Sequence, residues 1–189
     1  MTAAPDYCEP VIGWRAWRAV ENRGEIYLMS LFHRIRWPWL HALAGRCEMW
    51  QLPWHRHRTR HRPPSVDCEC GIYASTLEIA TDYAPTVPPR AQGPYAVVGN
   101  VALWGDVIEY TEGWRASFAY PTRLYVLFPG SSRARRESVT AHRVAAHLER
   151  YGVPVDVIHA WKPRDVIEAL SRRAGVDGHE IGRAAAGSV

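Results

Sequence analysis

Apolar and polar positions along the chain predict a mixture of strands and helices. Residues 11–32, "VIGWRAWRAVENRGEIYLMSLF", contain two runs rich in β-forming residues on either side of "ENRG", whose Asn and Gly suit a tight turn. This pattern predicts a hairpin. Residues 36–50 contain Pro38 near their start, which disfavours regular structure, so we expect an irregular segment or a helical turn there.

The strongest strand signal covers residues 95–127, where apolar positions alternate around Gly105. Gly99-Asn100 and Glu112-Gly113 are turn signals, so this region is predicted to form three strands with glycines at the bends. A sheet with such bends is expected to curl on itself, as an antiparallel curled sheet or a small barrel.

Three further segments carry helical signals. In residues 75–84, Ser75 and Glu78 have the spacing of a capping box, and Pro85 follows. A second helix is predicted to begin near Ser138, with Val144, Leu148 and Tyr151 on its apolar face and Gly152 after its end. Residues 153–161 predict a last short strand, and residues 162–175 a terminal helix.

The order of these elements predicts one α+β domain over residues 1–175, followed by a flexible tail at 176–189. Within the domain we expect a cysteine–histidine region at 47–70, a strand core at 95–128 and C-terminal helices at 138–175. With 189 residues, of which 47% are hydrophobic and 22% charged, the chain can bury a core without disulfide bonds.

The composition is unusual in its basic residues, because Lys162 is the only lysine among 23 lysines and arginines. A GC-rich genome is one explanation, but arginine is also the better ligand for phosphate groups and base edges. The chain has no apolar run of roughly 20 residues, the length of a membrane span. Its first residues lack the pattern of a signal peptide, so we expect a cytoplasmic, nucleoid-associated protein without a membrane partner.

Three cysteines and a histidine offer a set of metal ligands: Cys47, His61, Cys68 and Cys70. Cys-x-Cys followed by glycine allows a tight turn that points both thiolates to one side, and zinc prefers four such ligands in a tetrahedron. Because Cys47 precedes a basic segment and His61 ends it, one ion would hold both ends of that segment. We therefore predict a structural Zn²⁺ site.

Other interpretations of these residues stay open. Cys8, His55 and His57 compete as ligands, and the cysteines are alternatively ordinary buried thiols. Glu69, between two of the cysteines, is expected to point away from the metal, which argues against a catalytic site. A redox pair is disfavoured, since such pairs usually have two residues between the cysteines.

Two basic clusters suggest contacts with nucleic acid. In "WHRHRTRHR" every second residue is arginine, so an extended segment would place these side chains on one face, about 7 Å apart. That spacing suits contacts with successive phosphates of one strand, although solvated basic loops are common. The candidates are Arg56, Arg58, Arg60 and Arg62 in this segment, and Arg133, Arg135 and Arg136 further along the chain.

Aromatic and acidic residues of the strand region are candidates for a base-binding pocket. Two aromatic rings can sandwich a flat base, and a carboxylate can accept hydrogen bonds from its amino group. The candidates are Trp104, Asp106, Glu109, Trp114 and Tyr120. Tyr73 is a further candidate that faces either this pocket or the core, the core being favoured.

Two stretches, "HRPPSVDCECGIYA" and "VVGNVALWGDVIEYTEGWRASFAYPTRL", resemble a family of small actinobacterial proteins. The family pattern is His-x-x-Pro, Cys-x-Cys-Gly-Ile/Leu-Tyr/His-Ala, Gly-x-Val-x-Leu-Trp-Gly-x-Val-x-Glu, Gly-Trp/Tyr-Arg-Ala and Tyr-Pro. The resemblance runs from about Cys47 to Leu124. His61, Cys68 and Cys70 match the first motif, and Trp104, Gly105, Glu109, Gly113, Trp114, Arg115 and Tyr120 match the strand motif.

Some members of this family look like readers of modified DNA, with 5-methylcytosine as the modification. The resemblance therefore implies a DNA partner, and adds Arg115 to the candidate DNA contacts. Curled base-binding folds of the PUA and SRA type offer an analogy at the level of fold alone. The segment "RHRTRHR" is more basic than the family pattern, a departure that either serves phosphate contact or has no function.

The sequence thus favours a non-enzymatic DNA-binding protein that recognises modified DNA such as 5-methylcytosine. Two alternatives remain. One is a metal-dependent hydrolase or nuclease that uses His55, His57 or His61. The other is a zinc-stabilised protein-interaction module whose arginines meet an acidic partner. The oligomeric state cannot be inferred from the sequence.

Overall fold

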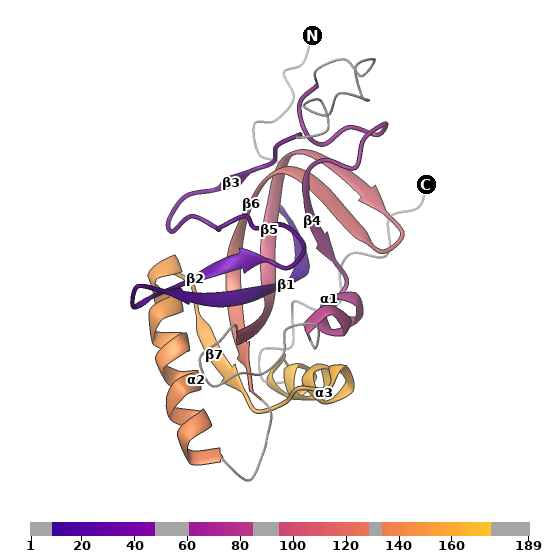
Figure 1. Cartoon of the computed structure of the whole chain (residues 1–189). Coiled ribbons are helices and arrows are strands. Elements are labelled where there is room, and N and C mark those ends of the chain that lie inside the picture. The colour runs from indigo at the N-terminus through magenta and orange to yellow at the C-terminus, as the bar shows by residue number, and fades with distance from the viewer. Residues whose placement is uncertain (1–8, 48–60, 85–94, 129–133, 175–189) are drawn as a thin grey trace.

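The computed structural model describes residues 9–47, 61–84, 95–128 and 134–174. Its sheet has seven strands, and helices flank it (Figure 1). The strands are β1 (Val11–Asn22), β2 (Glu25–Ser30), β3 (Leu43–Ala44), β4 (Ile72–Ser75), β5 (Tyr95–Tyr110), β6 (Gly113–Leu127) and β7 (Val155–Ile158). The helices are α1 (Leu77–Tyr83), α2 (Ala134–Leu148), the 3₁₀ turn η4 (Glu149–Tyr151) and α3 (Pro163–Ala174). The predicted α+β class with a curled sheet is confirmed.

The predicted N-terminal hairpin is confirmed. β1 and β2 pair antiparallel from Trp17↔Ser30 to Asn22↔Glu25, so that only two residues form the turn. These residues, Arg23 and Gly24, both have positive φ, at 51° and 80°. Such a turn has the twist that matches two paired strands.

Residues 95–127 form two long strands rather than the three that were predicted. Gly99-Asn100 is not a turn but lies within β5, where a Cβ on Gly99 would come 2.1 Å from the carbonyl oxygen of Arg123. Glycine is needed there for a close approach between strands, a need that looks like a turn signal in the sequence. The turn expected at Glu112-Gly113 does connect β5 to β6.

Irregularities in the pairing bend this long hairpin. The register of β5 against β6 shifts between Asn100 and Val101 and again between Trp104 and Val107. At the second shift Gly105, with φ at 79°, and Asp106 face Ser117 alone, which is the arrangement of a β-bulge. Bulges increase local twist, and here they let the sheet curl.

Curling brings four strands into a closed ring of pairings. β1 pairs with β5, β5 with β6, β6 with β4, and β4 with β1. The last pairing is the shortest, with the single register pair Trp14↔Ser75. The Arg15 guanidinium donates a hydrogen bond to the carbonyl of Tyr73 in β4 and so adds a second connection at this closure.

The two faces of the sheet carry two apolar cores. Because side chains alternate along a strand, Tyr95 and Val97 of β5 lie in one core while Ala96 and Val98 lie in the other. α2 covers the first core and α1 and α3 cover the second, as Figure 1 shows for the helices on either side of the sheet.

Most of the helical predictions hold. Val144, Leu148 and Tyr151 are buried as expected, and Gly152 ends η4 with φ at 70°. α3 begins at Pro163 and the short strand β7 precedes it. The predicted tail at 176–189 lies outside the described residues.

The capping box predicted at the start of α1 is wrong. The residue that caps this helix is Thr76, and it makes no side-chain hydrogen bond there. Ser75 belongs to β4, and its hydroxyl donates instead to backbone carbonyls, including that of Trp14 at 3.4 Å. Ser75 therefore pairs with β1 as a strand residue, although its spacing from Glu78 predicted a helix cap.

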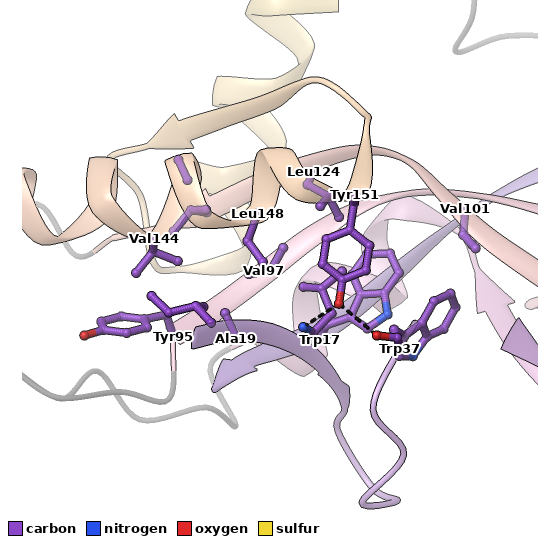
Figure 2. Close-up of a cluster of buried hydrophobic side chains, with 14 of the residues drawn as sticks. Trp17, Ala19, Trp37, Tyr95, Val97, Val101, Leu124, Val144, Leu148 and Tyr151 are labelled. Carbon is purple, nitrogen blue, oxygen red and sulfur yellow. Dashed lines mark hydrogen bonds between the residues drawn. The ribbon is translucent and has the colours of Figure 1, made fainter. Parts of the chain in front are cut away.

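Tyr151 ties η4 to the N-terminal hairpin from inside the first core (Figure 2). Its hydroxyl accepts a hydrogen bond from the Leu28 N–H at 2.9 Å and donates one to the Trp37 carbonyl at 3.0 Å. Burial raises the pKa of this hydroxyl to about 12, so it stays protonated and can keep donating. Around it, the rings of Trp17 and Trp37 meet edge to face at 5.3 Å.

Replacing this hydroxyl tests its role. We expect Tyr151→Phe to destabilise the protein by about 1–3 kcal/mol, because a buried N–H and a buried carbonyl lose their partner. Urea unfolding measures the change, and Tyr110→Phe is the control, since Tyr110 is 44% exposed. Equal unfolding free energies for the two variants would contradict this assignment.

Candidate metal centre

Cys47, His61, Cys68 and Cys70 come together as predicted. Their ligand atoms all lie within 4.8 Å of one another. Cys47 Sγ is 3.7 Å from Cys68 Sγ, and His61 Nε2 is 3.2 Å from Cys70 Sγ. The four side chains are therefore close enough to hold one metal ion.

The sulfur separation suits a metal better than a disulfide bond. A disulfide needs about 2.05 Å between its sulfurs. Two thiolates bound to zinc at about 2.3 Å lie about 3.8 Å apart in a tetrahedron, close to the 3.7 Å between Cys47 and Cys68. All three cysteines of the cluster are free thiols, so the set is compatible with zinc.

One edge of β6 positions the cluster. β4 pairs with Gly113 to Ala116 of β6, and β3 pairs with Phe118 and Ala119 immediately beyond. Cys47 follows β3 by three residues and Cys70 precedes β4 by two, so the two short strands deliver their thiols to the same place. The Ser117 carbonyl accepts a hydrogen bond from Gly45 N–H at 2.7 Å, which extends the β3 contact towards Cys47.

The segment that carries the other ligands is held to the same strand. The Ser117 hydroxyl donates to the Pro63 carbonyl at 2.8 Å, near His61. Cys68 N–H donates to the Ser65 carbonyl at 3.1 Å, which closes a tight turn. Gly71 then has φ at 118°, a conformation that side chains disfavour, and this explains the glycine after Cys-x-Cys. Glu69 is exposed and does not belong to the cluster, as predicted.

Arg115 lies beneath this turn, where the sequence placed a contact with DNA. Its side chain is 5% exposed, and its guanidinium donates to the carbonyls of Cys68, of Cys70 at 3.3 Å and of Ser65 at 3.5 Å. The rings of Tyr110 and Tyr73 lie 4.7 Å and 5.7 Å from it. Arg115 therefore holds the backbone that presents the thiols, and its donors are used within the protein.

The surroundings in the cluster shift the pKa values of two of its thiols in opposite directions. Burial raises the pKa of Cys68, but hydrogen bonds from the Cys70 backbone and from Cys47 outweigh it and lower the value to about 7. Burial, together with the neighbouring Cys68, raises the pKa of Cys70 to about 12. A bound cation would offset the repulsion between neighbouring thiolates, and it would therefore favour the thiolate form of both Cys68 and Cys70.

The competing ligands lie outside the described residues, as do most of the arginines predicted to contact DNA. Cys8, His55 and His57 are in segments that the structure does not describe. The same holds for Arg56, Arg58, Arg60 and Arg133, whereas Arg62 is exposed next to His61. Arg135 and Arg136 lie in the first turn of α2, and their side chains are outside the described part.

The six residues proposed for a base pocket are spread over different surroundings. Trp114 packs against the first core, and the hydroxyl of Tyr120 donates to the Tyr151 carbonyl at 2.7 Å. The ring of Trp104 stacks on that of Phe118 at 6.2 Å. Asp106 and Glu109 are exposed, and Glu109 lines a shallow hollow at the β5–β6 turn.

Tyr73 faces outward, although the core was favoured for it. It is 47% exposed, and its hydroxyl donates to the Glu69 carbonyl at 2.6 Å. β4 explains this placement, because Ile72 and Ala74 on either side of Tyr73 point into the core. Tyr73 and Tyr110 are exposed aromatic residues near the candidate metal centre, because both rings lie beside the Arg115 guanidinium that holds the cysteine turn.

Comparisons with protein-family models, with curated proteins and with solved structures found no match. No helix in the described part of the chain is long and apolar enough to cross a membrane.

Metal analysis tests the cluster. We expect the purified protein to carry one zinc ion per chain and Cys68→Ser to lose it, because three ligands remain. Cys8→Ser is the control and should keep the ion as the wild type does. Elemental analysis measures the content, and thiolate-to-metal absorption after cobalt substitution reports the ligands. Full metal content in Cys68→Ser, or loss in Cys8→Ser, would show that the ligands are assigned wrongly.

Arg115 is expected to tune the metal affinity without touching the ion. Arg115→Met removes the donor that orders the cysteine turn, and we expect zinc to bind about 10–100-fold more weakly. Competition with a chromophoric chelator measures this. Arg62→Met is the matched control, because it removes the same charge beside His61 while leaving the turn intact. Similar affinities in the two variants would contradict a positioning role.

Proposed function

We propose that the protein binds DNA without catalysing a reaction, and that a structural zinc ion organises its contact surface. In this proposal Cys47, His61, Cys68 and Cys70 bind the ion, and the arginines beside them contact phosphates. Modified DNA such as 5-methylcytosine is the ligand that the resemblance implies. The convergence of the four ligands across an arginine-rich segment is the observation that carries the proposal.

The donor set favours a structural ion. Three thiols and one imidazole fill all four positions of tetrahedral zinc, while catalytic zinc keeps one position open for water or substrate. Among the described residues, no carboxylate belongs to the cluster. A hydrolase or nuclease would need both an open position and a base, so the geometry disfavours this alternative.

The metal would act on the arginines through the chain itself. Residues 48–60 connect Cys47 to His61, whose donor atoms lie within 4.8 Å of each other. An ion that joins these two ligands restrains both ends of the segment with Arg56, Arg58 and Arg60. Restraining the ends removes conformations that the segment would otherwise lose on binding DNA, so less entropy opposes the contact.

Base recognition would use the exposed aromatic residues at this end. Tyr73 and Tyr110 are 47% and 44% exposed, so their rings can stack on a base. A buried methyl group contributes only about 0.8 kcal/mol, which is roughly a fourfold preference. Shape exclusion of the other bases would have to add to this preference.

Binding of one duplex sequence, methylated and unmethylated, at two salt concentrations tests the proposal. We expect affinity to fall with salt, with a slope of about −0.9 per phosphate contact, and methylation to increase affinity about fourfold. Changing Arg56, Arg58, Arg60 and Arg62 together to Gln should flatten the slope. Arg172→Gln in α3 is the control, because the ion pair that Arg172 makes among the described residues is with Glu168 in the same helix.

Three outcomes separate the alternatives. Affinity that does not change with salt would rule out DNA binding. Equal affinity for both duplexes at both salts would rule out recognition of the methyl group. A protein partner that stays bound after nuclease treatment would favour the interaction module.

A further inference from the structure

A second cationic surface lies beside the β1–β2 hairpin and is formed by residues that are far apart in the chain. The guanidinium of Arg36 lies 4.4 Å from the ring centroid of Tyr27 and 4.6 Å from that of Trp39. The guanidinium of Arg150 lies 3.8 Å from the same Trp39 ring. Two cations and two aromatic rings therefore stack on one another, and we call these four residues the arginine–aromatic stack.

The stack borders a half-open hollow with excess positive charge. Asn22, Arg23, Glu25, Tyr27 and Arg36 line this hollow. Glu25 is shared, at 3.8 Å from Arg36 and 3.3 Å from Arg150. Among the described residues Arg23 makes no ion pair, so three guanidinium groups face one carboxylate.

The neighbouring ion pair does not reduce this excess. Arg143 binds Glu21 through two hydrogen bonds, at 3.1 Å and 2.8 Å, and the two charges cancel. The Arg143 guanidinium accordingly holds the pKa of the Glu21 carboxyl below its usual range. An anion that enters the hollow would meet an excess of positive charge, because Arg23, Arg36 and Arg150 have only the Glu25 carboxylate as a counterion among the described residues.

Backbone contacts hold the stack in place without a ligand. Residues 35–37 run along β2, with Ser30 N–H donating to the Ile35 carbonyl at 3.0 Å and Trp37 N–H to the Leu28 carbonyl at 2.9 Å. Leu40 N–H donates to the Tyr120 hydroxyl at 2.7 Å, just after Trp39. In Figure 1 the β1–β2 turn lies beside one end of α2. Arg150 belongs to η4, which directly follows α2 in the chain.

Stacking leaves the donors of a guanidinium available. Contact with a ring uses the flat face of the group, while its five N–H donors point outward in the plane. Glu25 takes only part of the donors of Arg36 and Arg150. A group with several acceptor oxygens and a full negative charge matches what remains, and phosphate has both properties.

We propose that this hollow binds a phosphate group through Arg23 and Arg36, with Arg150 adding charge. The proposal rests on the proposed function in one respect, since it takes the DNA backbone as the source of the phosphate. It extends that function, because it places a phosphate contact beside the β1–β2 hairpin, at residues other than the metal ligands and the arginines proposed above.

Arg23→Asn is the sharpest variant. It removes one cation, and asparagine suits the positive φ of 51° at this position, so the hairpin should be kept or strengthened. We expect the salt slope of DNA binding to become smaller by about 0.9, which is about eightfold weaker binding at 0.1 M salt. Arg36→Lys keeps the charge but loses the planar fork, so we expect weaker binding with the slope nearly unchanged.

Arg172→Gln removes a charge on α3 and should leave DNA binding unchanged. Thermal unfolding of each variant checks that the fold is intact. DNA binding by the wild type together with unchanged affinity and slope in Arg23→Asn and Arg36→Lys would overturn this inference and leave DNA binding standing.

Inorganic phosphate separates this site from the proposed function. At constant ionic strength we expect it to shift the backbone amide resonances of Arg23, Gly24 and Arg36 in the wild type, and not that of Arg172. Those shifts without any DNA binding would support the phosphate site and refute its DNA source along with the proposed function. Absence of both the shifts and DNA binding would refute both.

Discussion

One edge of β6 is the constraint on which the metal centre depends. Its other edge is occupied by β5 along nearly its full length, so β4, β3 and β7 must pair in succession along what remains. β4 and β3 are therefore forced end to end, and the ligands that follow β3 and precede β4 meet beside Ser117. β3 is only two residues long, so its pairing has little stability of its own. A metal ion bound to Cys47 would stabilise this pairing, because it joins the residues after β3 to the turn before β4.

Guanidinium groups stabilise this fold through hydrogen bonds to backbone carbonyls. Arg115 holds the cysteine turn through three carbonyls, and Arg15 connects β1 to β4 where the strand ring closes. Burial lowers the pKa of Arg15 to about 10, which still leaves it charged at neutral pH. Arginine can satisfy several carbonyls at once because its donors are fixed in one plane. The high arginine content therefore has two explanations in one chain, internal support and exposed positive charge.

The exposed charge lies in two different settings. At the candidate metal centre, Arg62 is exposed next to the ligand His61. Beside the β1–β2 hairpin, aromatic rings and the shared Glu25 carboxylate hold Arg36 and Arg150 in place. Tyr151 supports the second setting from inside, because its hydroxyl joins Leu28 to Trp37 beside the stack.

Local signals in the sequence were enough for the β1–β2 hairpin, the apolar face of the helix that ends at Leu148, and the four candidate metal ligands, although that helix begins at Ala134 rather than near Ser138. Each depends on neighbours in the chain or on chemistry that few residue types provide, such as a two-residue turn or a soft metal donor. The sequence misled where a distant strand decided the outcome. Gly99 signalled a turn but permits a close approach to Arg123, Ser75 signalled a helix cap but pairs with β1, and Arg115 signalled a DNA contact but is buried under the cysteine turn. Glycine, serine and arginine each serve several roles, and only the tertiary structure selects one, because the partner that each requires lies far away in the sequence.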